Sequence, residues 1–451
     1  MHRFAKMGIF LFILFLSIFS IAIVRLPLFS KSNLKISVLL GVYYLKVLSG
    51  IAITIIYTYY YKDRSTSDIY KYFDDAKIIC TAIKEQPKIY VELVFGLNEN
   101  SADHIKYTSQ MRNWSSLDEN WLKYTKTKDT NFFNSNRIVT RINALLIPIS
   151  NGNIFIHVLF FSFLSFIGLF YLFKQISMQL KDNNLLIFII VFLLPSTLLW
   201  CSGTLKDTLV LSFVNILIYS LFKFEKQPFN LVTLFFITLL LYLIVLTKYY
   251  VAIALIPVLL GYAFKRMFKT GVLKSYIIIV CTLLICSFVL PLFLPALDIW
   301  QVLIDKREES LKTAIWAEAN HQIFYNTISN QVGEILINIP LSIFNAVFRP
   351  FIWEAGNSPF ILLSGAENGL IAFFIIYCLV KIDINKLNSE LLIFFLIFSI
   401  SSAFIIGFTT PITGGLVRYK TIFLIYLLLS AIQLSSTRFF LPQKVSNSIF
   451  K

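Results

Sequence analysis

The sequence predicts an all-α polytopic membrane protein. Of its 451 residues, 57% are hydrophobic and 14% are charged, whereas roughly 25% of residues are charged in soluble domains. The mean hydropathy is +0.75. Apolar runs of about 17 to 25 residues, the length of a helix that crosses a bilayer, recur along the chain. Composition and run length together therefore indicate the fold class.

About eleven runs are predicted to be transmembrane helices, with 207–222 and 250–264 among the shortest. They cover residues 7–24, 36–59, 154–173, 184–200, 207–222, 229–247, 250–264, 275–294, 360–380, 389–408 and 421–436. The first run lacks a small-residue cleavage site, so we expect a retained span and not a signal peptide. The five cysteines show no spacing typical of a disulfide framework.

These runs divide the chain into five parts. They are the first two transmembrane helices (1–61), an outer soluble loop segment (62–150), transmembrane helices 3 to 8 (151–294), an outer loop with an interfacial helix (295–358), and transmembrane helices 9 to 11 with a cytoplasmic tail (359–451). Aromatic residues among balanced charges predict that 62–150 is a small folded cap. The apolar stretch 335–348, with Pro340 inside, has about fourteen residues and is too short to span, which predicts a re-entrant or interfacial helix.

The distribution of Lys and Arg predicts the orientation. One set of short loops, including 265–274 and 381–386, is rich in Lys and Arg and should be cytoplasmic. The N-terminus and both long polar segments then lie on the outer face, in the cytoplasmic (inner) membrane if the source is bacterial. The net charge of +16 is mainly a topology signal, and no nucleic-acid partner is expected because no soluble part carries a basic stripe.

A carboxylate cluster opens the first outer segment. If Ser67 caps a helix that begins at Asp68, then Asp68, Tyr72 and Asp75 share one helical face, with Asp74 beside them. Such a carboxylate could act as general base toward an acceptor hydroxyl, or hold a divalent cation beside a pyrophosphate. The alternative interpretation is that acidic residues in a first turn only favour the helix dipole.

A second candidate is the turn 202–207, at the outer end of one predicted span. Lys206, flanked by Gly, Ser and Thr, could hold a lipid phosphate through its ammonium and nearby backbone amides. In the alternative interpretation this is an ordinary turn, in which Asp207 caps the next helix and Lys206 reaches the headgroups.

Further candidates follow the interfacial stretch and lie in the last spans. Arg349 and Glu354 flank a Trp, and Arg418 with Lys420 follows a Gly pair. Arginine suits bidentate phosphate recognition, although Arg, Trp and Tyr also serve as interfacial anchors. The pair Glu367 and Asn368 stands out because an acid inside a span is usually functional or ion-paired.

The sequence indicates no cofactor with certainty. The four histidines show no metal-ligand spacing, and we find no glycine-rich phosphate loop, no G-x-S-x-G elbow and no zinc motif. A divalent cation at the carboxylates is the one metal that these patterns permit.

An outer loop with Asp68, Tyr72, Asp74 and Asp75 in a many-span chain resembles the GT-C-type glycosyltransferases that use polyprenyl-phosphate sugars. The segments 202–207, 349–354, 365–368 and 417–420 also resemble uncharacterised bacterial membrane proteins of exopolysaccharide and O-antigen assembly. The acidic loop follows the second predicted span, whereas it follows the first in GT-C enzymes. This departure keeps a Wzy-like polysaccharide polymerase open, because those proteins resemble the chain in span count, large outer loops and arginines.

The resemblance implies a transferase of cell-envelope polysaccharide biosynthesis with a polyprenyl-linked sugar donor and a glycan acceptor as partners. Lys206, Arg349 and Arg418 would hold the donor phosphate in one cavity while an acid of the 68–75 cluster acts as base. An alternative from another class is a transporter or flippase of lipid-linked glycans, for which Glu367 could serve ion coupling.

Overall fold

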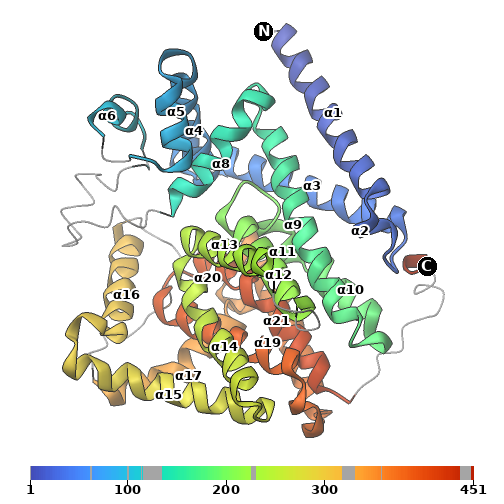
Figure 1. Ribbon diagram of the computed structural model, residues 1–451, viewed down its shortest axis with the longest axis vertical. Helices are drawn as coiled ribbons and strands as arrows, with labels where there is room; N and C mark the ends of the chain where they lie inside the picture. The colour runs from blue at the N-terminus through green and yellow to red at the C-terminus, as the bar shows by residue number, and fades with distance from the viewer. Residues whose placement is uncertain are drawn as a thin grey trace. The chain divides into compact units, whose positions relative to one another are not determined.

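The computed structural model describes residues 2–60, 63–98, 101–112, 114, 135–224, 230–316, 323, 331–356, 358–436 and 448–451. Within these ranges the regular elements are helices, joined by turns and two isolated β-bridges (Figure 1). The chain forms two compact units, Met1–Lys248 with Phe440–Lys451, and Tyr249–Phe439. Each unit is described by itself.

The first unit contains the predicted cap and the spans that support it. Its helices are α1 (His2–Arg25), α2 (Pro27–Ser30), α3 (Ile36–Tyr60), η1 (Arg64–Thr66), α4 (Asp68–Glu85), α5 (Pro87–Phe95), α6 (Ala102–Thr108), α8 (Asn136–Ser150), α9 (Ile154–Ser177), η3 (Lys181–Asn183), α10 (Asn184–Phe192), α11 (Pro195–Trp200), α12 (Lys206–Phe224) and α13 (Leu231–Thr247).

The second unit holds the other spans. Its helices are α14 (Tyr249–Phe268), α15 (Val272–Phe293), η4 (Pro295–Leu297), α16 (Ile299–Trp316), α17 (Val332–Phe348), η5 (Ile352–Glu354), α18 (Pro359–Val380), η6 (Ile384–Asn388), α19 (Glu390–Thr409), α20 (Thr413–Tyr419) and α21 (Thr421–Leu434).

Helix length and hydropathy confirm a multi-pass membrane protein. Among the described residues, seven helices are long and apolar enough to cross a membrane, namely α1, α3, α9, α14, α15, α18 and α19. The pair α20 and α21, bent by 58° at Lys420, makes an eighth span if the two helices cross together. The predicted runs 207–222 and 229–247 fall on α12 and on the 17-residue α13, which are not among these eight.

The predicted span 184–200 is not one helix. It consists of α10 and α11, separated by Leu193 and Leu194. Leu194 has an extended backbone, with φ −62° and ψ 118°, because the residue before a proline is disfavoured in the helical region. Pro195 then begins α11, where its missing N–H leaves no helical hydrogen bond unmade.

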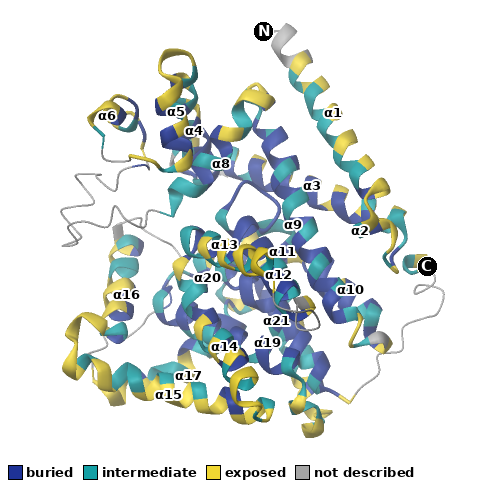
Figure 2. Ribbon diagram, in the orientation of Figure 1, coloured by how far each residue is buried: buried dark blue, intermediate teal, exposed yellow. Residues whose placement is uncertain are grey.

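The centre of the first unit is built from α3, α9 and α12. Figure 2 shows α9 buried along most of its length, whereas α1 is largely exposed. Two glycines permit the close packing. A side chain at Gly168 would come within 2.7 Å of the Ser212 backbone, and one at Gly50 within 2.6 Å of the Ser202 carbonyl oxygen. Helices of small residues can approach closely in this way.

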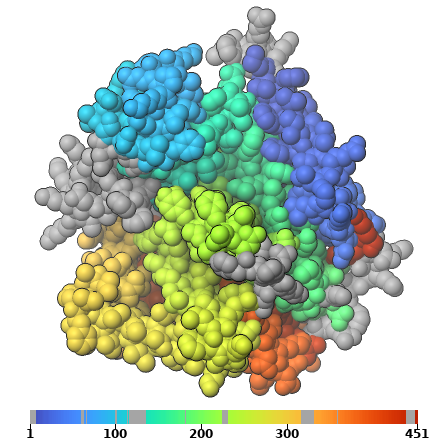
Figure 3. Space-filling view, viewed as in Figure 1, coloured from blue at the N-terminus to red at the C-terminus, as the bar shows by residue number. Residues whose placement is uncertain are grey.

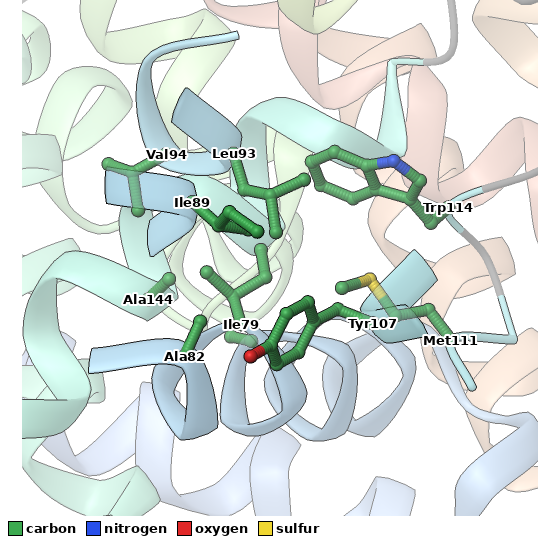
Figure 4. Close-up of a cluster of buried hydrophobic side chains, with 10 residues drawn as sticks. Ile79, Ala82, Ile89, Leu93, Val94, Tyr107, Met111, Trp114 and Ala144 are labelled. Carbon is green, nitrogen blue, oxygen red and sulfur yellow. The ribbon is translucent and has the colours of Figure 1, made fainter. Parts of the chain in front are cut away.

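The described part of the predicted cap is a folded helical body, as the sequence analysis expects. Helices α4, α5, α6 and α8 lie together in Figure 1, and Figure 3 shows the side chains of α4 to α6 packed into one rounded surface. Their shared core includes Ile79, Leu93, Tyr107, Met111 and Trp114, all buried (Figure 4). A core of this kind stabilises the cap through the hydrophobic effect.

Close packing of α17 against α19 organises the second unit. A side chain at Gly407 of α19 would lie 1.9 Å from the Ser342 carbonyl oxygen of α17 and 3.1 Å from Ala346. Helix α17 contains Pro340 and covers the predicted helix at 335–348, which is thereby confirmed. Its position relative to the membrane surface stays a prediction.

Candidate functional site

Helix α4 carries the three predicted acids and begins at Asp68, as predicted. Ser67 occupies the N-cap position, but its hydroxyl donates to the Arg64 carbonyl oxygen at 2.7 Å and does not cap the helix. Tyr72 and Asp75 are both buried, each 3% exposed, and Asp68 is half-buried. The predicted shared face therefore points into the protein.

The three acids have different surroundings. Asp75 accepts a hydrogen bond from the Arg112 backbone N–H at 3.0 Å, which ties α4 to the end of the α6 segment. Asp74 is partly exposed and forms ion pairs with Arg64 at 3.5 Å and with Lys77 at 3.7 Å. Asp68 occupies the first turn of α4, one turn before Tyr72. Burial and a backbone contact favour a structural role for Asp75, and the exposed ion pairs favour a surface role for Asp74.

Lys206 lies beside the face of α4. Its ammonium nitrogen is 5.7 Å from the centre of the Tyr72 ring and donates to the Ser135 hydroxyl at 2.7 Å. An ammonium this close to an aromatic face is held by a cation–π attraction. The structure thus brings together Lys206 and Tyr72, two residues that the sequence analysis placed in one site.

The turn before Lys206 is buried and is held by a lysine that the sequence analysis missed. Lys46 of α3 is fully buried, and its ammonium donates to the Cys201 carbonyl oxygen and the Ser202 hydroxyl, each at 3.0 Å. The Ser162 hydroxyl of α9 donates to the Ser202 carbonyl oxygen at 2.7 Å. Non-helical backbone that is buried in a membrane protein needs such partners. The sequence did carry a signal for this residue, because a lysine in the middle of the apolar run 36–59 is unusual.

Asp207 does not act as the predicted N-cap. It lies inside the first turn of α12, where it is fully buried and forms an ion pair with the nearly buried Lys248. Helix α12 begins at Lys206, so Asp207 cannot occupy the flanking cap position. Its partner follows the last residue of α13, and the pair joins α12 to the end of that helix.

The second unit contains a separate cluster of the predicted residues, around Arg349. Arg349 follows α17 and forms an ion pair with Glu354 at 3.2 Å between Nε and Oε1. The other carboxylate oxygen of Glu354 accepts from the Phe351 backbone N–H at 2.8 Å. Phe351 stacks on Trp353, with ring centres 4.7 Å apart. The Arg349 side chain stays 28% exposed, so it can reach a ligand.

Lys420 and Asn368 lie behind this cluster. Lys420 is fully buried at the bend between α20 and α21, and its ammonium donates to the Asn368 side-chain oxygen and, at 3.4 Å, to the Arg349 carbonyl oxygen. The Asn368 amide nitrogen donates to the Pro350 carbonyl oxygen at 2.8 Å. Glu367 is half-buried and interacts electrostatically with Lys420. The ammonium of Lys420 therefore serves protein contacts in this structure.

Arg418 is half-buried in the last turn of α20. Its carbonyl oxygen accepts from the Thr421 hydroxyl at 2.7 Å. Lys206 belongs to the first compact unit, whereas Arg349 and Arg418 belong to the second. The convergence of the three cations on one cavity accordingly stays a prediction.

Within the described ranges, no three His, Cys, Asp or Glu side chains are grouped to hold a metal ion. Comparisons of the chain with protein-family models, with curated proteins and with solved structures found no match. Function must therefore be argued from the residues themselves.

Proposed function

We propose that the protein is a membrane glycosyltransferase of cell-surface polysaccharide assembly that takes a sugar from a polyprenyl-phosphate-type donor on the outer face of the membrane. The observation that carries the proposal is the contact between Lys206 and Tyr72, on the face of α4 that also bears Asp68. A cation at the start of α12, held against an aromatic ring, and a carboxylate one helical turn from that ring suit a phosphate and a hydroxyl proton.

In the proposed reaction Asp68 is the general base. Its carboxylate accepts the proton of the acceptor hydroxyl while that oxygen attacks the anomeric carbon of the donor. The bond between the anomeric carbon and the phosphate oxygen breaks, and the lipid phosphate leaves with the electron pair. Lys206 stabilises the negative charge on the leaving phosphate. Asp68 is preferred over Asp75, because Asp68 is half-buried whereas Asp75 is only 3% exposed.

The supports in the first unit explain how Lys206 would be held for this task. Its turn is anchored by Lys46 and Ser162, and α12 is anchored by the pair of Asp207 and Lys248. Pre-positioned charges stabilise a transition state without further rearrangement. These buried residues would position the site and would not touch the substrate.

A Wzy-like polymerase is the second candidate, and the cluster at Arg349 favours it. A polymerase joins two lipid-linked glycans and so has two anionic lipids to recognise. Arg349 offers a second partly exposed cation, with the stacked rings of Phe351 and Trp353 beside it. A transporter or flippase of lipid-linked glycans is the third candidate, for which the half-buried Glu367, which interacts with Lys420, would be the coupling group.

The test is to delete the gene and restore it with single variants. Asp68→Asn keeps size but removes the base, so product should fall by about a hundred-fold or more at unchanged expression. Asp74→Asn, an acid on the same helix that is occupied by surface ion pairs, is the matched control and should retain activity. Full activity of Asp68→Asn would overturn the assignment of the base.

Analysis of lipid-linked and surface glycans in the deletion strain separates the three candidates. A truncated repeat unit indicates a transferase, whereas a complete but unpolymerised unit indicates a polymerase. A complete unit that accumulates on the inner face indicates a transporter or flippase. An unchanged glycan profile would contradict all three.

A further inference from the structure

The second unit has an apolar groove between two of its spans, far in sequence from every residue of the proposed site. It is about 310 Å³ in volume and lies between the first halves of α15 and α19. Its lining includes Ile277, Val280, Ile397 and Ile400, with Ser401 as a small polar residue. Figure 2 shows α15 largely exposed, so the groove opens toward the surroundings of the helix. In a spanning helix those surroundings are lipid.

One end of this groove is basic. The C-terminal end of α14, the start of α15 and the start of α19 come together there, since Lys265 of α14 pairs with Glu390 of α19 at 2.6 Å. This ion pair neutralises the acid at that end. Lys269, in the connection between α14 and α15, and Lys274, in the first turn of α15, are both exposed. Two cations thus stand where the groove begins.

We propose that this groove binds an anionic phospholipid. One acyl chain would lie along the apolar lining between α15 and α19, and the phosphate would face Lys269 and Lys274. Basic residues beside a cleft between transmembrane helices bind anionic lipid headgroups. Each Lys near the membrane surface adds to the electrostatic attraction. The occupant is a lipid and not a free phosphate, because a free anion would make no use of the apolar groove.

The proposal is tested with the full-length protein in nanodiscs that contain equal amounts of phosphatidylglycerol and phosphatidylcholine. After release into detergent, native mass spectrometry counts the retained lipids. The wild type should retain phosphatidylglycerol in preference. The double variant Lys269→Gln with Lys274→Gln should lose about ten-fold or more of that preference. Arg25→Gln with Lys31→Gln, which removes the same charge from exposed positions of the first unit, should keep it.

The groove itself is tested by Ser401→Phe, which fills it, against Ile285→Phe, at an exposed position of α15 outside the lining. The first variant should lose phosphatidylglycerol and the second should not. Equal retention of the two lipids by the wild type, or loss of the preference in both double variants alike, would overturn the proposal. If inorganic phosphate bound to the wild type as well as phosphatidylglycerol does, the site would be one for a free anion. That result would also overturn the proposal.

A photoreactive phosphatidylglycerol keeps the proposal falsifiable if a variant does not fold. Crosslinks on the wild type should map to α15 and α19. Crosslinks only on other helices would contradict the proposal, whatever the glycan assays show, because this site does not depend on the proposed transferase.

Discussion

Asp207 and Lys248 form a buried ion pair between the first turn of α12 and the residue that follows α13. Their side chains are 0% and 5% exposed, so water screens neither charge. Breaking a buried pair by removal of one partner leaves an uncompensated charge, which costs more than the pair contributes. The pair therefore fixes the position of α12, and with it that of Lys206, more strongly than the intrinsic helix propensity of α12 or α13 would.

Removal of one partner of this pair should destabilise the protein strongly. We expect Asp207→Leu to lower the free energy of unfolding by about 3–5 kcal/mol, because the buried side chain of Lys248 loses its carboxylate partner. Asp207→Leu with Lys248→Met should be milder than the single variant, since no charge remains. Thermal unfolding in detergent, followed by size-exclusion chromatography, measures both. If the double variant lost as much stability as Asp207→Leu and Lys248→Met lose together as single variants, the two residues would not be coupled.

The contact between Lys420 and Asn368 predicts a second coupled pair. Asn368→Leu should destabilise the protein by about 1–3 kcal/mol or more, because the buried ammonium loses an acceptor. Combination with Lys420→Met should recover part of that loss. The same unfolding assay gives the two values. If the two effects simply add, Lys420 and Asn368 do not depend on each other.

Gly407 predicts a steric effect. Gly407→Ala should cost about 1–3 kcal/mol of stability, because its Cβ would collide with the Ser342 carbonyl oxygen and force α17 away from α19. Gly369→Ala is the matched control. Gly369 lies within α18 with open space around it, so alanine should stabilise the helix by about 0.5–1 kcal/mol. Equal stability of the two variants would show that the helices can separate freely.

The cap should lose stability in acid. Hydrogen bonds from His104, at 2.9 Å, and from Asn98, at 3.1 Å, lower the pKa of the Glu92 carboxyl below its usual 4.5. A lowered pKa in the folded state means that the contribution is complete above the unfolded pKa and is lost as the pH falls through the folded pKa.

Amide hydrogen exchange of α5 and α6 measures this loss. At pH 7, Glu92→Gln should exchange faster than the wild type, and the difference should shrink as the pH falls through the lowered pKa of Glu92. Asp103→Asn, at an exposed acid of α6, is the control and should follow the wild type. A difference that persists in acid would mean that the carboxylate charge is not its cause.

Membrane orientation can be read from the same surface positions. In a cysteine-free background, we expect an impermeant maleimide to label Asp103→Cys in intact cells and to label Lys269→Cys only after lysis. The loop with Lys269 is among the basic loops that the charge rule places in the cytoplasm. Labelling of both positions in intact cells would contradict the predicted orientation and the proposed outer-face reaction.

The sequence by itself determined the class of the protein. Long apolar runs must be helical in lipid, because every backbone N–H and C=O needs a partner inside its own segment. This requirement is local, so the runs that became α3, α9 and α19 could be read from the chain with their approximate ends. The start of α4 at Asp68 could be read for another local reason, because serine is a residue type favoured at the position before a helix.

Only the tertiary structure decided which polar groups meet. Lys46 holds a turn 155 residues away, Asp207 pairs with Lys248, and Lys420 reaches Asn368. Hydropathy reports how apolar a run is and carries no information on which run packs beside it. The break before Pro195 was hidden inside an apolar run, and the bend at Lys420 lies just before the run 421–436. Buried charges select their partners by packing, and packing is a property of the assembled helices.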